Sequence, residues 1–332
     1  MTRRQASWAI AFAAMVVCAP AADAYLKLGS RIGTGVVTLR FSKLPIRYFI
    51  TNRDVPGVTA AQLQQSVERA FGSWTAIPDV ELSSQFAGFT GANPQTGDNA
   101  NVIGFRSRPE LDRVLGSTSF TVDTVTGEIL ESDIFLNSTF AWSVAAAGEA
   151  GRQDVESIAL HEIGHLQGLG HSMIGETELI SGGRRVLGAE AVMFPIAFTA
   201  GSLNRTPRAD DIAGISDIYG NGRFRGATGS ISGRVTKNGA GVLGAHVVAF
   251  NPATGKLVAT FSLAEDGAFV IAGLDPGPQI VRVEPLDDAD VTSFLDTSFK
   301  VDADFRVAFH NRLVTVPRGG TARNVELKVV GK

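Results

Sequence analysis

The sequence predicts an α+β domain followed by a small all-β sandwich. Up to about residue 220, segments rich in β-branched and aromatic residues alternate with segments that repeat apolar residues at helical spacing. Beyond that point the helical repeat is lost, and short apolar runs alternate with turn residues. A length of 332 residues, about twice the ~150 of a typical domain, agrees with two domains.

The charge of the chain excludes some classes of partner. A formal net charge of -3, without any dense run of Lys or Arg, gives no broad attraction for a phosphate backbone or an anionic membrane. We therefore expect no nucleic-acid partner, and we expect the protein to be a monomer.

The first 24 residues have the features of an export signal. Arg3 and Arg4 precede an apolar stretch from Trp8 to Val17, and Ala22–Ala24 offers small side chains at the two positions that a signal peptidase requires. The apolar stretch is well short of the ~20 residues that span a membrane. The sequence predicts cleavage before Tyr25 and release into the periplasm or the medium, with no transmembrane segment.

The segment after the signal predicts one or two strands and then a helix. Residues 36–52 contain the β-branched and aromatic runs, with Pro45 at an entry or edge position. Thr59 and Gln62 form a capping-box pattern, which marks the start of a helix. One face of this helix would carry Leu63, Val67, Phe71 and Trp74.

Several strands and a second helix follow. Between residues 80 and 137 short apolar runs alternate with Gly, Asn, Asp and Pro clusters, and Ile129–Leu136 is the last of the predicted strands. Asp154 is a suitable N-cap for a helix that begins at Val155. Its helical repeat consists of Val155, Ile158, Ala159, Glu162, Ile163 and Leu166.

The strongest functional signal is the stretch HEIGHLQGLGH, which runs from His161 to His171. His161 and His165 are four residues apart, so both imidazoles project from one helical face at a separation that one zinc ion can bridge. Gly168 can adopt a positive φ and lets the chain turn so that His171 approaches the same ion. Three neutral imidazoles leave the fourth tetrahedral position of the zinc open for water.

Glu162 is the candidate general base. It follows the first histidine, about 100° further around the helix, where it can hydrogen-bond a zinc-bound water without ligating the metal. This arrangement predicts amide hydrolysis by attack of water, in which the carboxylate takes a proton and delivers it to the leaving amine. The three histidines could instead be ordinary core or surface residues, but the chain has only five, and three fall in this register.

The extended histidine motif resembles that of the metzincins, in which a methionine turn lies beneath the metal. Met193, within Ala191–Pro195, matches that turn. Within the metzincins the sequence is most similar to the matrixins. Three features carry that similarity: Ser172 directly after His171, Pro195 two residues after Met193, and Asp210–Ile215 leading to Tyr219 and Gly220.

The resemblance covers roughly residues 46–220 and implies both a fold and an activity. The implied fold is a twisted, mostly parallel sheet with the active-site helix beneath it. The implied activity is zinc-dependent hydrolysis of internal peptide bonds, on polypeptides that bind extended in a cleft against an edge strand. The pocket for the residue after the cut would be walled by residues around Met193–Ile196.

Two features of animal matrixins have no counterpart here. Cys18 is the only cysteine and lies in the predicted signal peptide, so no pro-segment thiol can cap the zinc. Only His246 and His310 remain for a structural zinc, and both lie beyond residue 220, so we expect one catalytic zinc. Calcium is a further candidate, although acidic loops are often simply solvated; the carboxylates concerned are Asp98, Asp123, Glu128 and Asp133.

Glycines crowd residues 221–229, which predicts a linker, and residues 230–332 would form the sandwich. This part resembles the carboxypeptidase regulatory-like, transthyretin-like domains in three segments: residues 232–235, 244–247 and 266–277. His246 is then an ordinary strand residue. Beyond Pro285 we expect an irregular insertion and a closing strand at residues 324–330. The predicted strands are residues 231–235, 246–250, 257–261, 269–271 and 280–283.

Two other functions fit parts of the pattern. The chain could be a secreted adhesion or carbohydrate-binding protein that uses the sandwich for contact and the zinc domain as scaffold. It could also be a zinc hydrolase whose substrate is not a protein. Glu162 argues against the first, because a scaffold has no physical need for an acid beside the metal. The edge-strand binding implied by the family argues against the second.

Overall fold

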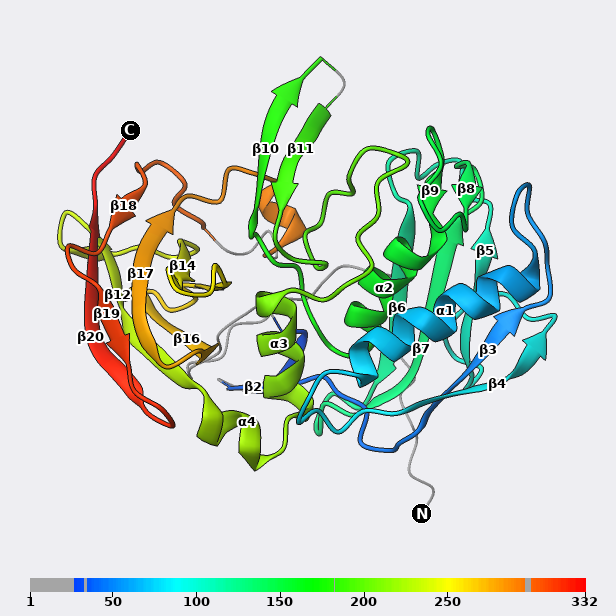
Figure 1. The fold of residues 1–332 in the computed structure, drawn as a ribbon, viewed down its shortest axis with the longest axis horizontal. Helices are drawn as coiled ribbons and strands as arrows, with labels where there is room; N and C mark the ends of the chain where they lie inside the picture. Colours follow the sequence, from blue (N-terminus) through cyan, green and yellow to red (C-terminus); the bar gives the residue numbers. More distant parts are fainter. Residues whose placement is uncertain (1–26, 33–34, 182, 296–299) are drawn as a thin grey trace.

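The computed structural model describes residues 27–332 except 33–34, 182 and 296–299. The predicted signal peptide, residues 1–24, lies outside the described residues, so its cleavage stays a prediction. Figure 1 shows a mixed sheet with two helices on one side of the molecule and the C-terminal strands on the other. In the described part of the chain, no helix is both long and apolar enough to cross a membrane.

The first sheet has five strands in the order β4-β3-β5-β7-β6. Its β3–β4, β3–β5 and β5–β7 pairs are parallel, and β6 is an edge strand antiparallel to β7. The expected mostly parallel sheet is confirmed. The strands are β3 (Ile46–Thr51), β4 (Ser84–Thr90), β5 (Asn101–Arg106), β6 (Gly116–Val122) and β7 (Ile129–Asn137).

Both predicted helices are present, and they pack against each other beside this sheet (Figure 1). Helix α1 (Ala60–Thr75) begins with the capping box of Thr59 and Gln62, and its four predicted apolar residues are each at most 1% exposed. Helix α2 (Val155–Leu166) is capped by Asp154, which accepts the backbone N–H of Ser157. The indole of Trp74 donates to the carbonyl of Leu160 at 3.0 Å and so fixes α1 against the histidine helix.

Smaller elements complete the first domain. The hairpin of β10 and β11 was not predicted; it lies in the chain between His171 and Met193 and projects from the body of the molecule (Figure 1). Helix α3 contains the matrixin-like segment 210–215. These elements are β1 (Gly29–Ile32), β2 (Gly35–Thr38), β8 (Trp142–Ser143), β9 (Gln153–Asp154), β10 (Gly175–Ile180), β11 (Gly183–Ala189) and α3 (Ala209–Tyr219).

The stretch 221–229, interpreted from sequence as a linker, contains the short helix α4 (Gly222–Ala227), and β12 begins at Gly229. Asn221 caps α4, because its side-chain oxygen accepts the N–H of Arg223. The glycines of this stretch indicated a linker, so the helix was not predicted. The exact domain limits remain a prediction.

The C-terminal strands form two sheets that share one apolar core, as a sandwich requires. All the strands predicted here are present, and a 3₁₀ helix, η1 (Val291–Ser293), lies in the irregular stretch expected after Pro285. One sheet contains β12 (Gly229–Lys237), β13 (Ala240–Gly241), β16 (Ala268–Leu274) and β20 (Thr321–Val329). The other contains β14 (His246–Phe250), β15 (Leu257–Phe261), β17 (Gly277–Glu284), β18 (Ala308–Phe309) and β19 (Val314–Val316).

The sandwich packs directly on the first domain. Asp210, at the start of α3, accepts the backbone N–H of Ala259 in β15 at 2.8 Å. Ile174 and Ala191 join Val248 and Ala259 in one buried cluster. A second buried cluster combines Met173 with Phe261, Leu286, Ala289, Phe294 and Leu295.

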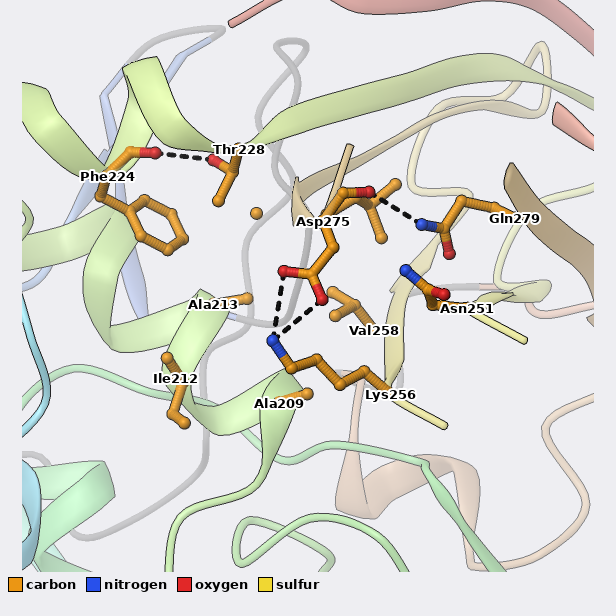
Figure 2. Close-up of a pocket in the computed structure, with 12 residues that line it drawn as sticks. Ala209, Ile212, Ala213, Phe224, Thr228, Asn251, Lys256, Val258, Asp275 and Gln279 are labelled. Carbon is orange, nitrogen blue, oxygen red and sulfur yellow. Dashed lines mark hydrogen bonds and ion pairs between the residues drawn. The ribbon is translucent and has the colours of Figure 1, made fainter. Parts of the chain in front are cut away.

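Figure 2 shows a small cavity at the same boundary, between α3, α4 and the sandwich. Its volume is about 90 Å³. Lys256 and Asp275 form an ion pair at its edge, with Nζ and Oδ2 2.9 Å apart. No residue of the histidine stretch lines it.

Candidate metal centre

The structure brings the three predicted ligands together. His161 and His165 lie one turn apart on α2, His171 follows the helix, and their ligand atoms lie within 4.8 Å of one another. Gly168 has a φ of +100°, as the sequence predicted, and a Cβ there would lie 2.3 Å from the carbonyl oxygen of Leu39. The chain can therefore turn back towards the helix only with glycine at this position.

Each imidazole is oriented by a backbone carbonyl at its Nδ1 atom. The Nδ1 atom of His161 lies 2.8 Å from the carbonyl oxygen of Val192, and that of His165 lies 2.8 Å from the carbonyl oxygen of Leu169. His171 pairs with Ser293, in the C-terminal domain, at 2.6 Å. Since a carbonyl oxygen only accepts, each Nδ1 carries the proton. The Nε2 lone pairs of the neutral rings are then available to a metal.

The electrostatics also suit metal binding. Burial is the main cause that lowers the pKa of each of the three imidazoles, and it brings the pKa of His171 to about 3. The rings are therefore neutral at ordinary pH, as ligands must be.

The spacing between the rings fits zinc. His165 Nε2 and His171 Nε2 are 3.1 Å apart, and both atoms present a lone pair. A tetrahedral zinc with ~2.0–2.1 Å bonds holds two nitrogens roughly 3.3 Å apart. Two lone pairs this close repel unless a cation lies between them. His161 and His171 are both partly exposed, so the centre can be reached from solvent.

The side chain of Glu162 extends from α2 to the edge strand β6. Its side chain is 5% exposed, and the hydroxyl of Thr118 donates to its Oε2 atom at 2.7 Å. Burial raises the pKa of Glu162 to about 7, against the opposing effect of the Thr118 hydrogen bond. Gly116 faces the same carboxyl group, because a Cβ there would lie 2.9 Å from Oε1. Sequence reasoning missed both Thr118 and Gly116.

Replacing Gly116 with alanine is expected to displace the Glu162 carboxyl group. The added methyl would lie 3.0 Å from Cγ and 3.1 Å from Cδ of Glu162, so the side chain must move. Because a displacement of ~1 Å can cost ~10²-fold in rate, we expect kcat for any hydrolysis at this site to fall roughly 10-fold or more. Gly91→Ala is the control, since nothing lies within 4 Å of its added Cβ. Equal kcat in Gly116→Ala and the control would contradict this placement.

Met193 lies under the histidine helix. It is 2% exposed, and a Cβ on Gly164 would lie 2.3 Å from its sulfur atom. Asp211, on α3, accepts the backbone N–H groups of Val192 at 2.8 Å and Met193 at 3.1 Å. The same Val192 supplies the carbonyl that orients His161. Asp211 thus fixes the turn that supports the first ligand.

The acidic residues proposed for calcium have partners within the protein. Asp123 accepts N–H groups of its own turn, Glu128 accepts from Ser42, and Asp133 accepts the N–H of Val102. Asp98 is exposed. Burial raises the pKa of Asp133 to about 8. Among the residues that the structure describes, only the three histidines form a metal-sized group, so calcium stays a prediction.

His246 occupies strand β14, as expected, and is fully buried with its Nδ1 atom 2.8 Å from Glu284 Oε1.

The predicted pocket wall, Met193–Ile196, begins with the buried side chains of Met193 and Phe194. Ile196 packs against the cluster that contains Phe294.

Comparison with known proteins agrees with this geometry. Residues 40–220, more than half of the chain, match the family model described as matrixin. Three similar proteins come from Arabidopsis thaliana. Metalloendoproteinase 2-MMP is 29% identical over 181 residues, which are 50% of this chain and 40% of that protein. Metalloendoproteinase 4-MMP is 25% identical over 175 residues, or 50% of this chain and 42% of that protein.

A third relative, Metalloendoproteinase 5-MMP, is 42% identical over a shorter stretch of 67 residues, 20% of this chain and 14% of that protein. The chain thus spans less than half the length of each of these relatives. The matched residues include all three histidines, Glu162 and Met193. From its fold, its histidine centre and the extent of this match, the chain belongs to the matrixin family.

Proposed function

We propose that this protein is a zinc-dependent endopeptidase in which His161, His165 and His171 hold the metal and Glu162 is the general base. The observation that carries the proposal is the convergence of three imidazoles beside a buried carboxyl group. All three relatives are named metalloendoproteinases.

In this reaction the zinc ion, Glu162 and Thr118 each have a separate role. Zinc, when bound, polarises the scissile carbonyl and lowers the pKa of water to ~7. Glu162 takes a proton from the attacking water and delivers it to the amine nitrogen as the C–N bond breaks, which yields one carboxylic acid and one amine. Burial raises the pKa of this carboxyl group above its ordinary value, which favours its acceptance of a proton. Thr118 holds the carboxyl group in place.

The position of Glu162 also supports a polypeptide substrate. It lies beside β6, the edge strand of the sheet, whose outer side has no partner strand among the described strands. An extended peptide could add to this edge through backbone hydrogen bonds, which places one internal peptide bond next to the carboxyl group. The side chain after that bond would face the wall formed by residues 193–196.

Two further parts of the proposal concern the rest of the chain. Matrixins are generally extracellular, and export through the predicted signal peptide agrees with this.

We also assign the C-terminal sandwich to the carboxypeptidase regulatory-like class. Its two sheets around one core and its turns at Gly267 and Gly277, both with positive φ, support that assignment.

Cleavage of a mixed peptide library tests the proposed activity. We expect internal cuts that 1,10-phenanthroline abolishes and added zinc restores, because removal of the metal leaves only the Glu162 carboxyl group. The fragments would also report the preferred side chain after the cut. A zinc-loaded protein that cuts no peptide would instead favour the alternative, a secreted binding protein.

A further inference from the structure

We propose that the C-terminal sandwich completes the zinc centre, because its η1 helix positions His171 through the backbone carbonyl of Ser293. The inference rests on the proposed function in so far as the three histidines hold zinc. It assigns the sandwich a role inside the catalytic site, in addition to any ligand that the sandwich binds itself.

The contact is specific to one ligand. His161 and His165 are oriented by Val192 and Leu169, which belong to the first domain. His171 has its Nδ1 atom 2.6 Å from the carbonyl oxygen of Ser293, 122 residues further along the chain. His171 also lies beyond the end of α2, so the helix itself does not orient it. Its orientation depends on a residue of the other domain.

The Ser293 carbonyl has a defined direction because η1 is closed by its own hydrogen bonds. The N–H of Ser293 donates to Asp290 at 2.8 Å, and those of Phe294 and Leu295 donate to Val291 at 3.0 and 2.9 Å. These bonds hold consecutive peptide groups in one arrangement. The acceptor is therefore already in place before a metal binds.

The side chain of Phe294 packs η1 against both domains. Its side chain is 0% exposed and belongs to the cluster that includes Met173 of the first domain and Phe261 of the sandwich. Its ring centroid lies 6.4 Å from that of His171 and 5.8 Å from that of Phe261.

A second attachment lies just before η1. Asp288 accepts the backbone N–H of Thr177 through its side chain and the Thr177 hydroxyl through its own carbonyl, each at 2.7 Å. Thr177 lies in strand β10, six residues after His171. The segment from Asp288 to Phe294 is thus bound to the first domain at both ends.

Loss of this arrangement should weaken zinc binding. Without the Ser293 acceptor, the Nδ1–H of His171 would lose its protein partner, and the ring could turn its Nε2 away from the metal. Disruption of such outer hydrogen bonds typically costs ~10–100-fold in metal affinity.

The experiment is a comparison of Phe294→Ala with Phe305→Ala in the full protein. Phe305 is also 0% exposed, but it belongs to the core of the sandwich, so it controls for general destabilisation. The zinc dissociation constant would be measured by competition with a chromogenic chelator, at a temperature where circular dichroism shows both variants folded. We expect Phe294→Ala to raise the constant ~10-fold or more, and Phe305→Ala to change it less than about 3-fold.

Two further measurements distinguish a loss of His171 positioning from a loss of protein stability. Phe294→Leu keeps most of the buried volume and should restore zinc affinity to near that of the parent. Nitrogen-15 NMR of the histidine rings should show three protected Nδ1–H groups in the zinc-loaded parent, and Phe294→Ala should lose protection at His171 alone.

The outcomes distinguish this inference from the proposed function. Parent-like zinc affinity in Phe294→Ala, or equal losses in both alanine variants, would overturn the positioning role while the zinc site stands. A parent that binds no zinc would overturn both.

Discussion

Replacing Glu162 with glutamine is expected to lower kcat for peptide cleavage by ~10²–10⁴ while the bound zinc is retained. The amide has nearly the shape of the carboxylate and can still accept the Thr118 hydrogen bond, but it cannot take a proton from water. Because the three imidazoles are held by other groups, metal content should not change. Peptide cleavage and zinc content would be measured on the same preparation.

Glu156→Gln is the matched control for this substitution. Glu156 is a second buried glutamate on α2, and its carboxylate binds Arg69 at 2.6 Å. This variant should lose some stability but keep kcat, since no group of the metal centre contacts Glu156 in the described contacts. Parent-like kcat in Glu162→Gln would remove Glu162 from the mechanism.

Replacing Gly164 with alanine is expected to lower the free energy of unfolding by about 1–3 kcal/mol, because overpacking a tight core displaces its neighbours. The new Cβ would lie 2.3 Å from the sulfur of Met193 and 3.0 Å from the ring of Trp74. Met193 and Trp74 are 2% and 0% exposed, so both are enclosed by other side chains. Urea denaturation of the zinc-free protein measures the effect without the contribution of metal binding.

Gly72→Ala on α1 is the opposite case. It is also a helical glycine, but it is exposed, and its added Cβ would meet nothing within 4 Å. Alanine there should stabilise the protein by up to ~1 kcal/mol, since glycine is the poorer helix former. Similar changes in both variants would contradict the packing described for Met193.

The sequence predicted those parts of the molecule that depend on local spacing. The capping box at Thr59, the N-cap at Asp154 and the turn at Gly168 all act within a few residues, so their patterns can be recognised in one segment. The three ligands are likewise contained in eleven consecutive residues, from His161 to His171.

The parts that could not be predicted depend on contacts between distant segments. Thr118 reaches Glu162 across 44 residues, and nothing in its own strand marks it. The Ser293 contact uses a backbone carbonyl, which every residue has, so no residue type could have indicated it. Strands β10 and β11 pair antiparallel although their polar and apolar residues do not alternate regularly.

Zinc-edge X-ray absorption can show whether three imidazoles hold one zinc ion and leave one coordination position open. The protein loaded with one equivalent of zinc should show three nitrogen neighbours and one oxygen neighbour at ~2.0–2.1 Å. His171→Ala should lose one of the nitrogen neighbours. An unchanged spectrum after replacement of all three histidines, with zinc still bound, would show that other residues hold the metal.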